Sequence, residues 1–186
     1  MLTVEYKLTE EEYLNYNYYT CWLMPEKKIY RLKYYLTISL LFFFIELGVL
    51  YILSDNKIST FTLLLVSGLS ICIFFLLPFR MKSIFASKAK KLLAKSGPDT
   101  LISNTALTFT ETGIFGKNAV AEVKYLWTAI KKKVIINDCY YLYVNIQQAV
   151  VIPIRAFQSK EENEKFELIL AEHLPLETEF SFLSRK

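Results

Sequence analysis

Glu46 is the residue whose type and place in this chain bear most directly on chemistry. It is the only charged side chain within two apolar stretches, Leu36–Leu53 and Thr60–Leu77. A charge in the middle of a membrane-spanning segment is costly, so such a carboxyl either bonds to a neighbouring helix or serves a proton or ion pathway. The residues alone leave both interpretations open.

The other reactive side chains do not form a recognisable catalytic or metal motif. His173 is the one histidine, and no second histidine or nucleophile accompanies it. Cys21, Cys72 and Cys139 are an odd set without CxxC spacing, which predicts three reduced thiols. The sequence shows no glycine-rich phosphate loop and no pair of acid and base carboxylates. We therefore expect no enzyme activity, no cofactor and no metal.

The two apolar stretches predict a pair of transmembrane helices. Eighteen residues of helix rise about 27 Å, close to the thickness of the hydrocarbon core of a bilayer. A short polar segment, Ser54–Ser59, joins the two stretches. Both outer flanks are basic, which predicts a multi-pass membrane protein with both termini cytoplasmic. The flanking residues are Lys27, Lys28, Arg31, Lys33, Arg80, Lys82, Lys88, Lys90, Lys91 and Lys95.

A tight hairpin centred between Asn56 and Lys57 would place Glu46 beside Ser67 and Gly68. Glycine permits close approach of two helices, and serine can form a hydrogen bond between them. We therefore expect Glu46 to be a neutral carboxyl that clamps the hairpin. The alternative is a small transporter or channel subunit with Glu46 inside an oligomer. The other polar residues of the first stretch lie nearer its ends: Thr37, Ser39 and Tyr51.

Composition limits the class of partner. The chain has 186 residues, and 53% of them are hydrophobic, which is high for a soluble domain. The net charge is +4, but residues 100–186 hold ten Lys/Arg and ten Asp/Glu. Because the excess charge flanks the apolar stretches, it indicates membrane topology and argues against a nucleic-acid partner.

The sequence after Gly97-Pro98 is strand-like. Short β-rich runs at 106–110, 114–116, 119–123, 134–136, 140–144 and 149–152 are separated by turn residues. A capping box at Ser159–Glu162 opens a closing helix. Its apolar face consists of Phe166, Ile169, Leu170 and Leu174. The predicted fold class is an α+β membrane protein with a helical hairpin and a small β-roll closed by a C-terminal helix.

The N-terminal segment has its own strand pattern. Leu2 to Tyr6 alternates, and a capping box at Thr9–Glu12 predicts a helix that breaks before Pro25. An isolated strand cannot satisfy its backbone, so we expect Leu2–Tyr6 to pair with the sheet of the C-terminal domain. The aromatic residues between 16 and 22 either form an interfacial belt or pack on that domain.

Five segments are therefore expected. They are an N-terminal strand and helix at 1–33, a transmembrane hairpin at 34–79, a basic juxtamembrane helix and linker at 80–98, a β-rich domain at 99–175 and a tail at 176–186. The juxtamembrane helix either lies on anionic lipid or continues the second span into the cytoplasm, and we favour the continuation.

Several motifs resemble the YcxB-like family of bacterial membrane proteins. The first is Val4-Glu5-Tyr6 with Leu8-Thr9, Glu11 and Tyr13. Others are Leu107-Thr108-Phe109 with Gly113-Ile114, Tyr125-Leu126-Trp127-Thr128-Ala129-Ile130, Tyr140-Tyr141-Leu142-Tyr143, and the most specific, Ala149–Phe157. The resemblance implies a C-terminal domain similar to pleckstrin-homology (PH) folds. It implies no established biochemical activity.

The resemblance also bears on single residues of the domain. Trp127, Ile130 and Phe157 are expected as core anchors, because large aromatic residues dominate small cores. Arg155 and the run Lys131-Lys132-Lys133 are candidate contacts for a partner or an anion. This chain has Ile154 where a second basic residue would be expected, so a basic pair at that place is missing.

Two function classes follow. The first is an anchored PH-like interaction domain that binds a cytoplasmic or membrane protein, or a peptide of one, at a sheet edge or a groove. The second is the transporter or channel subunit that uses Glu46. The partners expected are the lipid bilayer, an unidentified protein and a second copy of the chain as a homo-oligomer.

Overall fold

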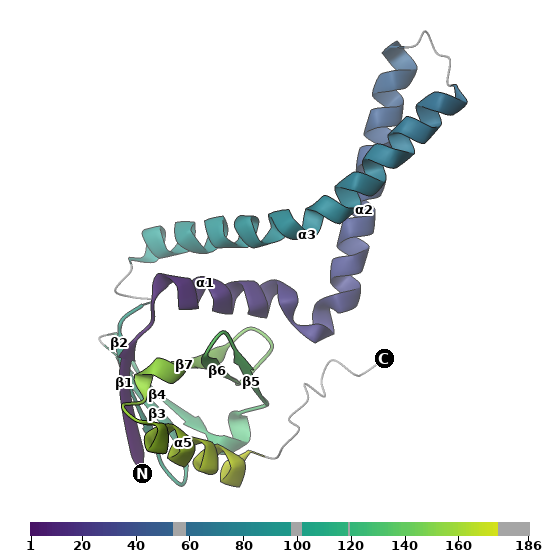
Figure 1. Cartoon of the computed structure of the whole chain (residues 1–186). Coiled ribbons are helices and arrows are strands. Elements are labelled where there is room, and N and C mark those ends of the chain that lie inside the picture. The colour runs from purple at the N-terminus through teal and green to yellow at the C-terminus, as the bar shows by residue number, and fades with distance from the viewer. Residues whose placement is uncertain (54–58, 98–101, 119, 175–186) are drawn as a thin grey trace. The chain divides into compact units, whose positions relative to one another are not determined.

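The computed structural model describes residues 1–53, 59–97, 102–118 and 120–174. The expected hairpin turn at 54–58, the linker beyond Gly97 and the tail at 176–186 lie outside these residues. The chain forms two compact units, and their elements are labelled in Figure 1. The sheet unit comprises residues 1–21 and 89–186, and the helical unit comprises residues 22–88.

The first sheet of the sheet unit takes its first strand from the N-terminus. Strands β1 (Leu2–Lys7), β2 (Asn104–Phe109), β3 (Gly113–Asn118) and β4 (Glu122–Leu126) form a four-stranded antiparallel sheet in that order. β1 pairs with β2 so that Val4 lies opposite Leu107. The expectation that the N-terminal strand joins the C-terminal sheet is confirmed.

The second sheet is a three-stranded meander. Strands β5 (Lys132–Ile136), β6 (Cys139–Tyr143) and β7 (Ala149–Pro153) are antiparallel neighbours. Asn137 and Asp138 turn the chain between β5 and β6 with φ of 48° and 57°. Two consecutive positive φ angles are typical of the tight hairpin turn that matches the twist of the strands.

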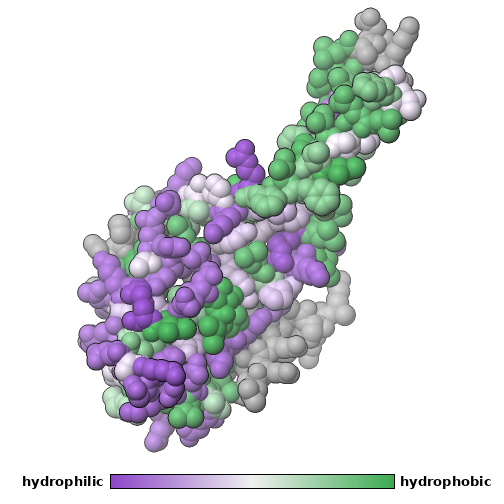
Figure 2. Space-filling model, viewed as in Figure 1, coloured by the Kyte–Doolittle hydropathy of each residue, from purple (hydrophilic) through white to green (hydrophobic). Residues whose placement is uncertain are grey.

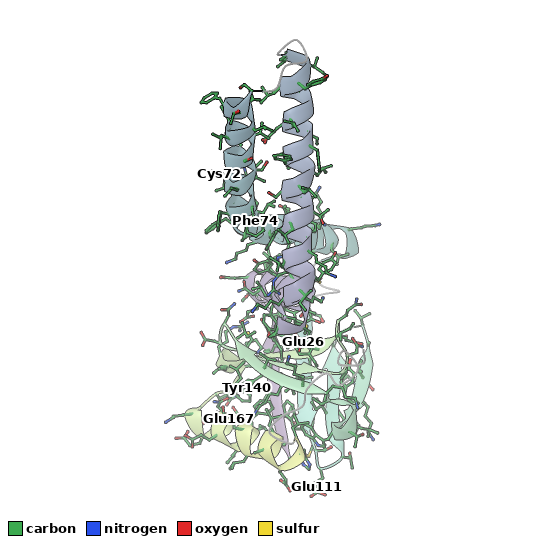
Figure 3. The ribbon with its side chains drawn as sticks, turned by 90° about the vertical axis from the view of Figure 1, so that its right-hand side faces the viewer. Glu26, Cys72, Phe74, Glu111, Tyr140 and Glu167 are labelled. Atoms are coloured by element: carbon green, nitrogen blue, oxygen red, sulfur yellow. The ribbon has the colours of Figure 1, made fainter. Side chains whose placement is uncertain are left out.

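The core lies between the two sheets and helix α5 (Lys160–His173). Ser159 caps the helix by accepting a hydrogen bond from the Glu162 backbone N–H. Phe166 and Leu170 of α5 are fully buried. Tyr140 of β6 faces α5, where its Oη donates to Glu167 Oε1 at 2.6 Å (Figure 3). The short helices η3 (Trp127–Ala129) and η4 (Ile154–Ala156) complete the enclosure.

Helix α1 (Glu10–Tyr18) covers the second sheet on the side away from the core. The capping box is present, since Thr9 Oγ1 accepts from the Glu12 N–H and Glu12 accepts from the Thr9 N–H. All five residues of β6 are buried. Tyr140 and Leu142 face the core, and Tyr141 and Tyr143 lie under α1 and the following π-helix η1 (Tyr19–Leu23).

Residues 8–103 are inserted between β1 and β2, and a second, smaller hydrophobic cluster joins the start of this insertion to its end. Tyr13 of α1 packs with Ala89, Leu93 and Ile102. An ion pair between Lys90 and Glu10 lies at 3.0 Å in the same unit. Residues 1–21 therefore belong with the C-terminal β-structure, and the expected segment 1–33 is divided between the two units at residue 21.

Two long apolar helices make up the helical unit. Helix α2 (Lys28–Leu53) follows a short helix η2 (Pro25–Lys27), and α3 (Thr60–Ser96) runs without a break through Pro78. Both are long and apolar enough to cross a membrane. Hydrophobic residues gather on their surfaces (Figure 2). The expected juxtamembrane helix at 80–98 is thus a continuation of α3, which ends where Gly97 adopts φ of 80°.

Trp22 anchors the start of the helical unit. Its ring is 3% exposed and meets Tyr34 and Phe85 at centroid distances of 5.2 and 5.4 Å. Arg31 Nη1 donates to the Met24 carbonyl at 2.9 Å, at the turn before Pro25. The helix break expected there is confirmed. Tyr16 and Tyr19, by contrast, pack on Tyr141 in the sheet unit.

Candidate functional sites on the helix pair and on strand β4

Glu46 bonds across the helix pair to Ser70. Ser70 Oγ donates to Glu46 Oε2 at 3.3 Å, and Ser39 Oγ donates to the Ser70 carbonyl oxygen at 2.7 Å. Ser70 is buried, whereas Glu46 is partly exposed. These two bonds connect α2 with α3 at a single residue, Ser70.

The partner of Glu46 is therefore Ser70, and the expected pairing with Ser67 is wrong. The reason is the direction of helical side chains, which lean towards the helix N-terminus. The leaning carries the Glu46 carboxyl about one turn back along α2, where it meets a serine that lies later in α3. Gly68 makes no close approach either, because a Cβ built there would have nothing within 4 Å.

Arg155 binds a carboxylate of its own chain. Its Nε donates to Glu12 Oε1 at 2.8 Å, and its Nη2 donates to Glu12 Oε2 at 2.7 Å. The same Nη2 donates to the Lys7 carbonyl at 2.8 Å. This two-pronged geometry is the strong form of a carboxylate–guanidinium pair. Arg155, expected as a contact for a partner or an anion, thus fastens α1 to the residues after β7.

The electrostatics at Glu12 follow from these bonds. Partial burial would raise the pKa of the Glu12 carboxyl, but hydrogen bonds from Arg155 and Thr9 outweigh burial, and the pKa is lowered. The pKa of Arg155 is raised, chiefly by its bonds to Glu12. The pair is therefore charged at neutral pH.

The three lysines at the start of β5 do not form one patch. Lys131 and Lys133 are exposed, and Lys132 between them is partly buried, as alternation along a strand requires. Lys131 Nζ donates to the Thr128 carbonyl at 3.0 Å. An anion would therefore meet two of these side chains at most from one side of the sheet.

The residues expected as anchors lie in the core. Trp127, Ile130 and Phe157 are 6%, 3% and 8% exposed and belong to the main hydrophobic cluster. Trp127 Nε1 donates to the Thr110 carbonyl at 2.8 Å. His173 stacks on the Trp127 ring with centroids 4.9 Å apart and planes 11° apart. This places the C-terminal end of α5 beside the residue that follows β4.

Within the described ranges, no group of three His, Cys, Asp or Glu side chains is placed to hold a metal. Cys21 and Cys72 are exposed, Cys139 is buried, and all three are thiols. Burial raises the pKa of the Cys139 thiol to about 11, so it is not a thiolate at neutral pH.

Strand β4 forms one edge of the first sheet and is largely exposed. Val123 and Leu126 expose 40% and 51% of their surfaces. On the outer face, a groove of about 480 Å³ runs past Phe115, Lys117 and Lys124. Lys124 Nζ lies 4.8 Å above the centre of the Phe115 ring. This face offers both apolar and cationic contacts.

A second groove, of about 260 Å³, lies on the inner side of β4, between the two sheets. Val123 and Tyr125 of β4 line one side, and Ala149 to Val151 of β7 line the other. Tyr16 of α1 reaches the edge of β7, where its Oη accepts from the Ala149 N–H at 3.1 Å and donates to the Gln147 carbonyl at 2.9 Å. A strand added to β4 would have one row of side chains facing each groove.

Sequence reasoning did not find Ser70, Glu12 or β4 as parts of a site. The lean of helical side chains would have predicted a partner for Glu46 beyond Ser67. Glu12 was found only as a member of a capping box, because no local pattern shows a partner more than a hundred residues away. Which strand ends a sheet depends on the order of all the strands.

The comparisons with known proteins concern the C-terminal β-structure. No curated protein and no solved structure matches the chain. Residues 109–170, from the last residue of β2 into α5, match the family model described as YcxB-like protein. The resemblance to the YcxB-like family that the motifs indicated is confirmed for this segment, which holds β3 to β7 and most of α5, whereas the motif at Val4–Tyr13 lies outside it.

Proposed function

We propose that this chain is a bacterial integral membrane protein that presents a PH-like domain to the cytoplasm. The exposed apolar surfaces of α2 and α3 support insertion as a hairpin, because such surfaces are costly in water. The basic residues at both outer ends of the pair support cytoplasmic termini. Sheets of four and three antiparallel strands with a closing helix support the PH-like assignment.

The domain binds an extended segment of a partner protein by strand addition. The observation that carries this proposal is the exposed edge of β4 with a groove on each side of it. Edge strands of this kind bind peptides through main-chain hydrogen bonds, and the flanking pockets select side chains. The activity is binding and not catalysis.

Site-specific photocrosslinking in native membranes tests this function. A photoreactive amino acid at Lys124 should give a defined protein adduct, and the same group at Lys133, on the edge of the other sheet, should not. The matched blocking variant is Lys124→Pro, because proline removes a backbone donor from the edge of the sheet. In this variant the photoreactive amino acid is placed at Leu126, since position 124 is occupied by proline. Equal adducts at both lysines, or adducts that survive the proline, would refute binding at β4.

The bonds at Ser70 bear on the alternative, a transporter or channel subunit. Ser39, Ser70 and Glu46 form a connected polar track within the helix pair. However, each of the two bonds joins α2 to α3 directly, which is what a clamp requires. We therefore retain the clamp as the role of Glu46 and place transport second.

A further inference from the structure

Two apolar residues of β4 have no side chain opposite them in β3. Val123 lies opposite Gly116. Leu126 lies opposite Gly113. Directly opposite side chains cover each other in a sheet, and glycine supplies no such cover. Val123 and Leu126 therefore stay 40% and 51% exposed, and a strand on the free side of β4 would cover both.

The two charged residues of β4 differ in whether they already have a partner. Glu122 forms an ion pair with Lys117 of β3 at 2.5 Å. Lys124 lies opposite Phe115, and its Nζ is 4.8 Å from the centre of the ring. Among the residues that the structure describes, no carboxylate pairs with Lys124. One positive charge on the outer face of β4 is therefore available to an acidic side chain.

The register of β3 and β4 shows which backbone groups face the free edge. The Asn118 N–H donates to the Ala121 carbonyl at 3.0 Å, so these two residues form a hydrogen-bonded pair. Hydrogen-bonded and non-bonded pairs alternate along an antiparallel ladder. The backbone groups of Glu122, Lys124 and Leu126 therefore point away from β3, towards the free edge.

A strand added at this edge would pair with the same three residues. Directly opposite side chains of an antiparallel pair lie on the same face of the sheet. The added residue opposite Lys124 therefore lies on the outer face, next to the lysine ammonium group. Its two neighbours lie on the inner face, opposite Val123 and Tyr125, because successive side chains of a strand alternate.

The inner groove takes side chains and not backbone. It lies between β4 and β7 and measures about 260 Å³, below the usual range for small-molecule pockets. The edge of β7 is already bonded there, since Tyr16 Oη accepts from the Ala149 N–H. Tyr6 Oη likewise donates to the Val151 carbonyl. Because Val123 and other apolar residues line the rest of the groove, it suits apolar side chains of a strand that pairs with β4.

A second copy of this chain is a poorer occupant than another protein. Strand β1 has a similar order of side chains from Val4 to Lys7. However, β1 already pairs with β2, and on its other side the Lys7 carbonyl accepts from Arg155 Nη2 at 2.8 Å. The edge of β1 is therefore interrupted, whereas a free extended segment of another protein meets β4 without this obstacle.

We propose that β4 selects an extended peptide by the pattern apolar, apolar, acidic, apolar, followed by a residue that is not acidic. The peptide runs antiparallel to β4, as all neighbours in the first sheet do, with its acidic residue opposite Lys124. Its three apolar residues lie opposite Leu126, Tyr125 and Val123. The last position lies opposite Glu122, which would repel a second acid. The inference rests on the proposed function for the choice of edge, and it names the chemistry of the partner, with Lys124 as the residue that determines specificity.

Two short peptides of the same composition test the pattern. The full chain is placed in lipid nanodiscs with one copy in each, and binding of fluorophore-labelled peptides is measured by anisotropy. The core sequence Leu-Val-Glu-Val-Thr places its glutamate opposite Lys124, whereas Leu-Val-Thr-Val-Glu places it opposite Glu122. The second peptide should bind about tenfold more weakly, because like charges opposed across an interface are unfavourable. Equal affinities of the two peptides would overturn the inference.

Exchange of charge between chain and peptide shows whether Lys124 reads the acidic position. Lys124→Glu should weaken binding of the glutamate peptide about tenfold and strengthen binding of the peptide with lysine at that position. Lys124→Gln, which adds no negative charge beside Glu122, should give a smaller loss in the same direction. Lys133→Glu, on the edge strand of the other sheet, is the matched control and should change neither affinity. Unchanged affinities in both Lys124 variants, with the amide of Leu142 in β6 still protected as evidence of folding, would refute the role of Lys124.

The proposed function and this inference can fail separately. Photocrosslinking in native membranes from a photoreactive amino acid at Leu126, which retains Lys124, identifies the bound segment by mass spectrometry. An acidic residue flanked by apolar residues in that segment supports the pattern, and a segment without one overturns it while leaving strand addition in place. An adduct between two copies of this chain would also overturn it. No adduct, together with peptide binding that depends on Lys124, would refute partner binding in the cell and leave the specificity of β4 standing.

Discussion

Two glutamates of this chain hold together segments that are distant in sequence. Glu46 accepts a hydrogen bond from Ser70 on the opposite helix, and Glu12 accepts two from Arg155. The first lies between apolar helices and the second at a partly exposed surface. The energetic effects of losing the two glutamates differ, because the exclusion of water strengthens a polar contact and raises the cost of leaving a polar group unpaired.

Glu46→Gln should leave insertion and folding of the helix pair nearly unchanged. Glutamine keeps an acceptor oxygen for the Ser70 hydroxyl and removes the possibility of carrying a proton. Glu46→Leu should weaken the association of α2 with α3 by about 1 kcal/mol, the usual size of such a bond in a membrane. Unfolding of the helix pair at increasing concentrations of a denaturing detergent measures the stability of both variants. If Glu46→Gln folds normally but loses an ion-dependent activity, the result would favour the transport alternative.

Glu12→Gln should destabilise the sheet unit by about 1 kcal/mol, a small value because the Arg155 side chain is half exposed and screened by water. The loss should depend on pH. The carboxylate pKa is lower in the folded state than its ordinary value of 4.5, so its stabilisation is complete above that value and disappears as pH falls through the lowered pKa. Denaturation midpoints between pH 7 and pH 2 should therefore converge for the wild type and the variant. A constant difference at all pH values would contradict this role.

At the scale of elements, strand β6 shows how one run of residues can serve two faces. Tyr140 points to the core side and bonds to Glu167 and Asn163, while Tyr141 and Tyr143 lie under α1 and η1. The Tyr143 hydroxyl lies 2.7 Å from Thr20 Oγ1. The Tyr141 hydroxyl is the one buried side-chain polar atom for which the described residues supply no partner.

These three tyrosines should respond differently to loss of the hydroxyl. Tyr140→Phe and Tyr143→Phe should each destabilise the sheet unit by about 1 kcal/mol, because each leaves a partner without its bond. Tyr141→Phe should be neutral or stabilise by up to about 1 kcal/mol, because it removes a buried polar atom that has no bond to lose. Chemical denaturation of the three variants under one condition measures the order. A destabilising Tyr141→Phe would show that its hydroxyl has a partner, such as a buried water.

At the scale of the whole molecule, the helical hairpin is inserted between the first and second strands of one sheet. The domain therefore holds both ends of the insertion, through β1 and α1 on one side and the end of α3 on the other. Deleting residues 2–7 should remove the partner of β2 and expose its edge, so the whole sheet unit should lose stability. Loss of protected amides in β2, and not only in the deleted strand, is the expected observation by hydrogen exchange.

Membrane topology is a separate expectation at the same scale. In a variant whose native cysteines are replaced, a cysteine at Asn56 should react with a membrane-impermeant thiol reagent in intact cells, and one at Lys160 should not. Lysed cells provide the control, because both positions should then react. The opposite pattern in intact cells would reverse the orientation and place the sheet unit outside the cytoplasm.

The sequence by itself determined the elements of this protein. Short β-rich runs between turn residues marked the strands, although the run expected at 119–123 lies earlier than β4, which is Glu122–Leu126. Capping boxes marked the starts of α1 and α5, and the length of the two apolar runs marked α2 and α3, because each of these signals is written in neighbouring residues. The pairing of β1 with the C-terminal sheet also followed, since a lone strand must find a partner.

Only the tertiary structure decided which side chains meet. The lean of helical side chains indicates a partner for Glu46 beyond Ser67, but only the packing of α2 against α3 shows that this partner is Ser70. Arg155 meets Glu12 because two sheets and a helix bring residues 12 and 155 together. The exposed edge at β4 is likewise a property of the order of strands. Contacts of this kind depend on the summed geometry of several elements, which no short stretch of sequence contains.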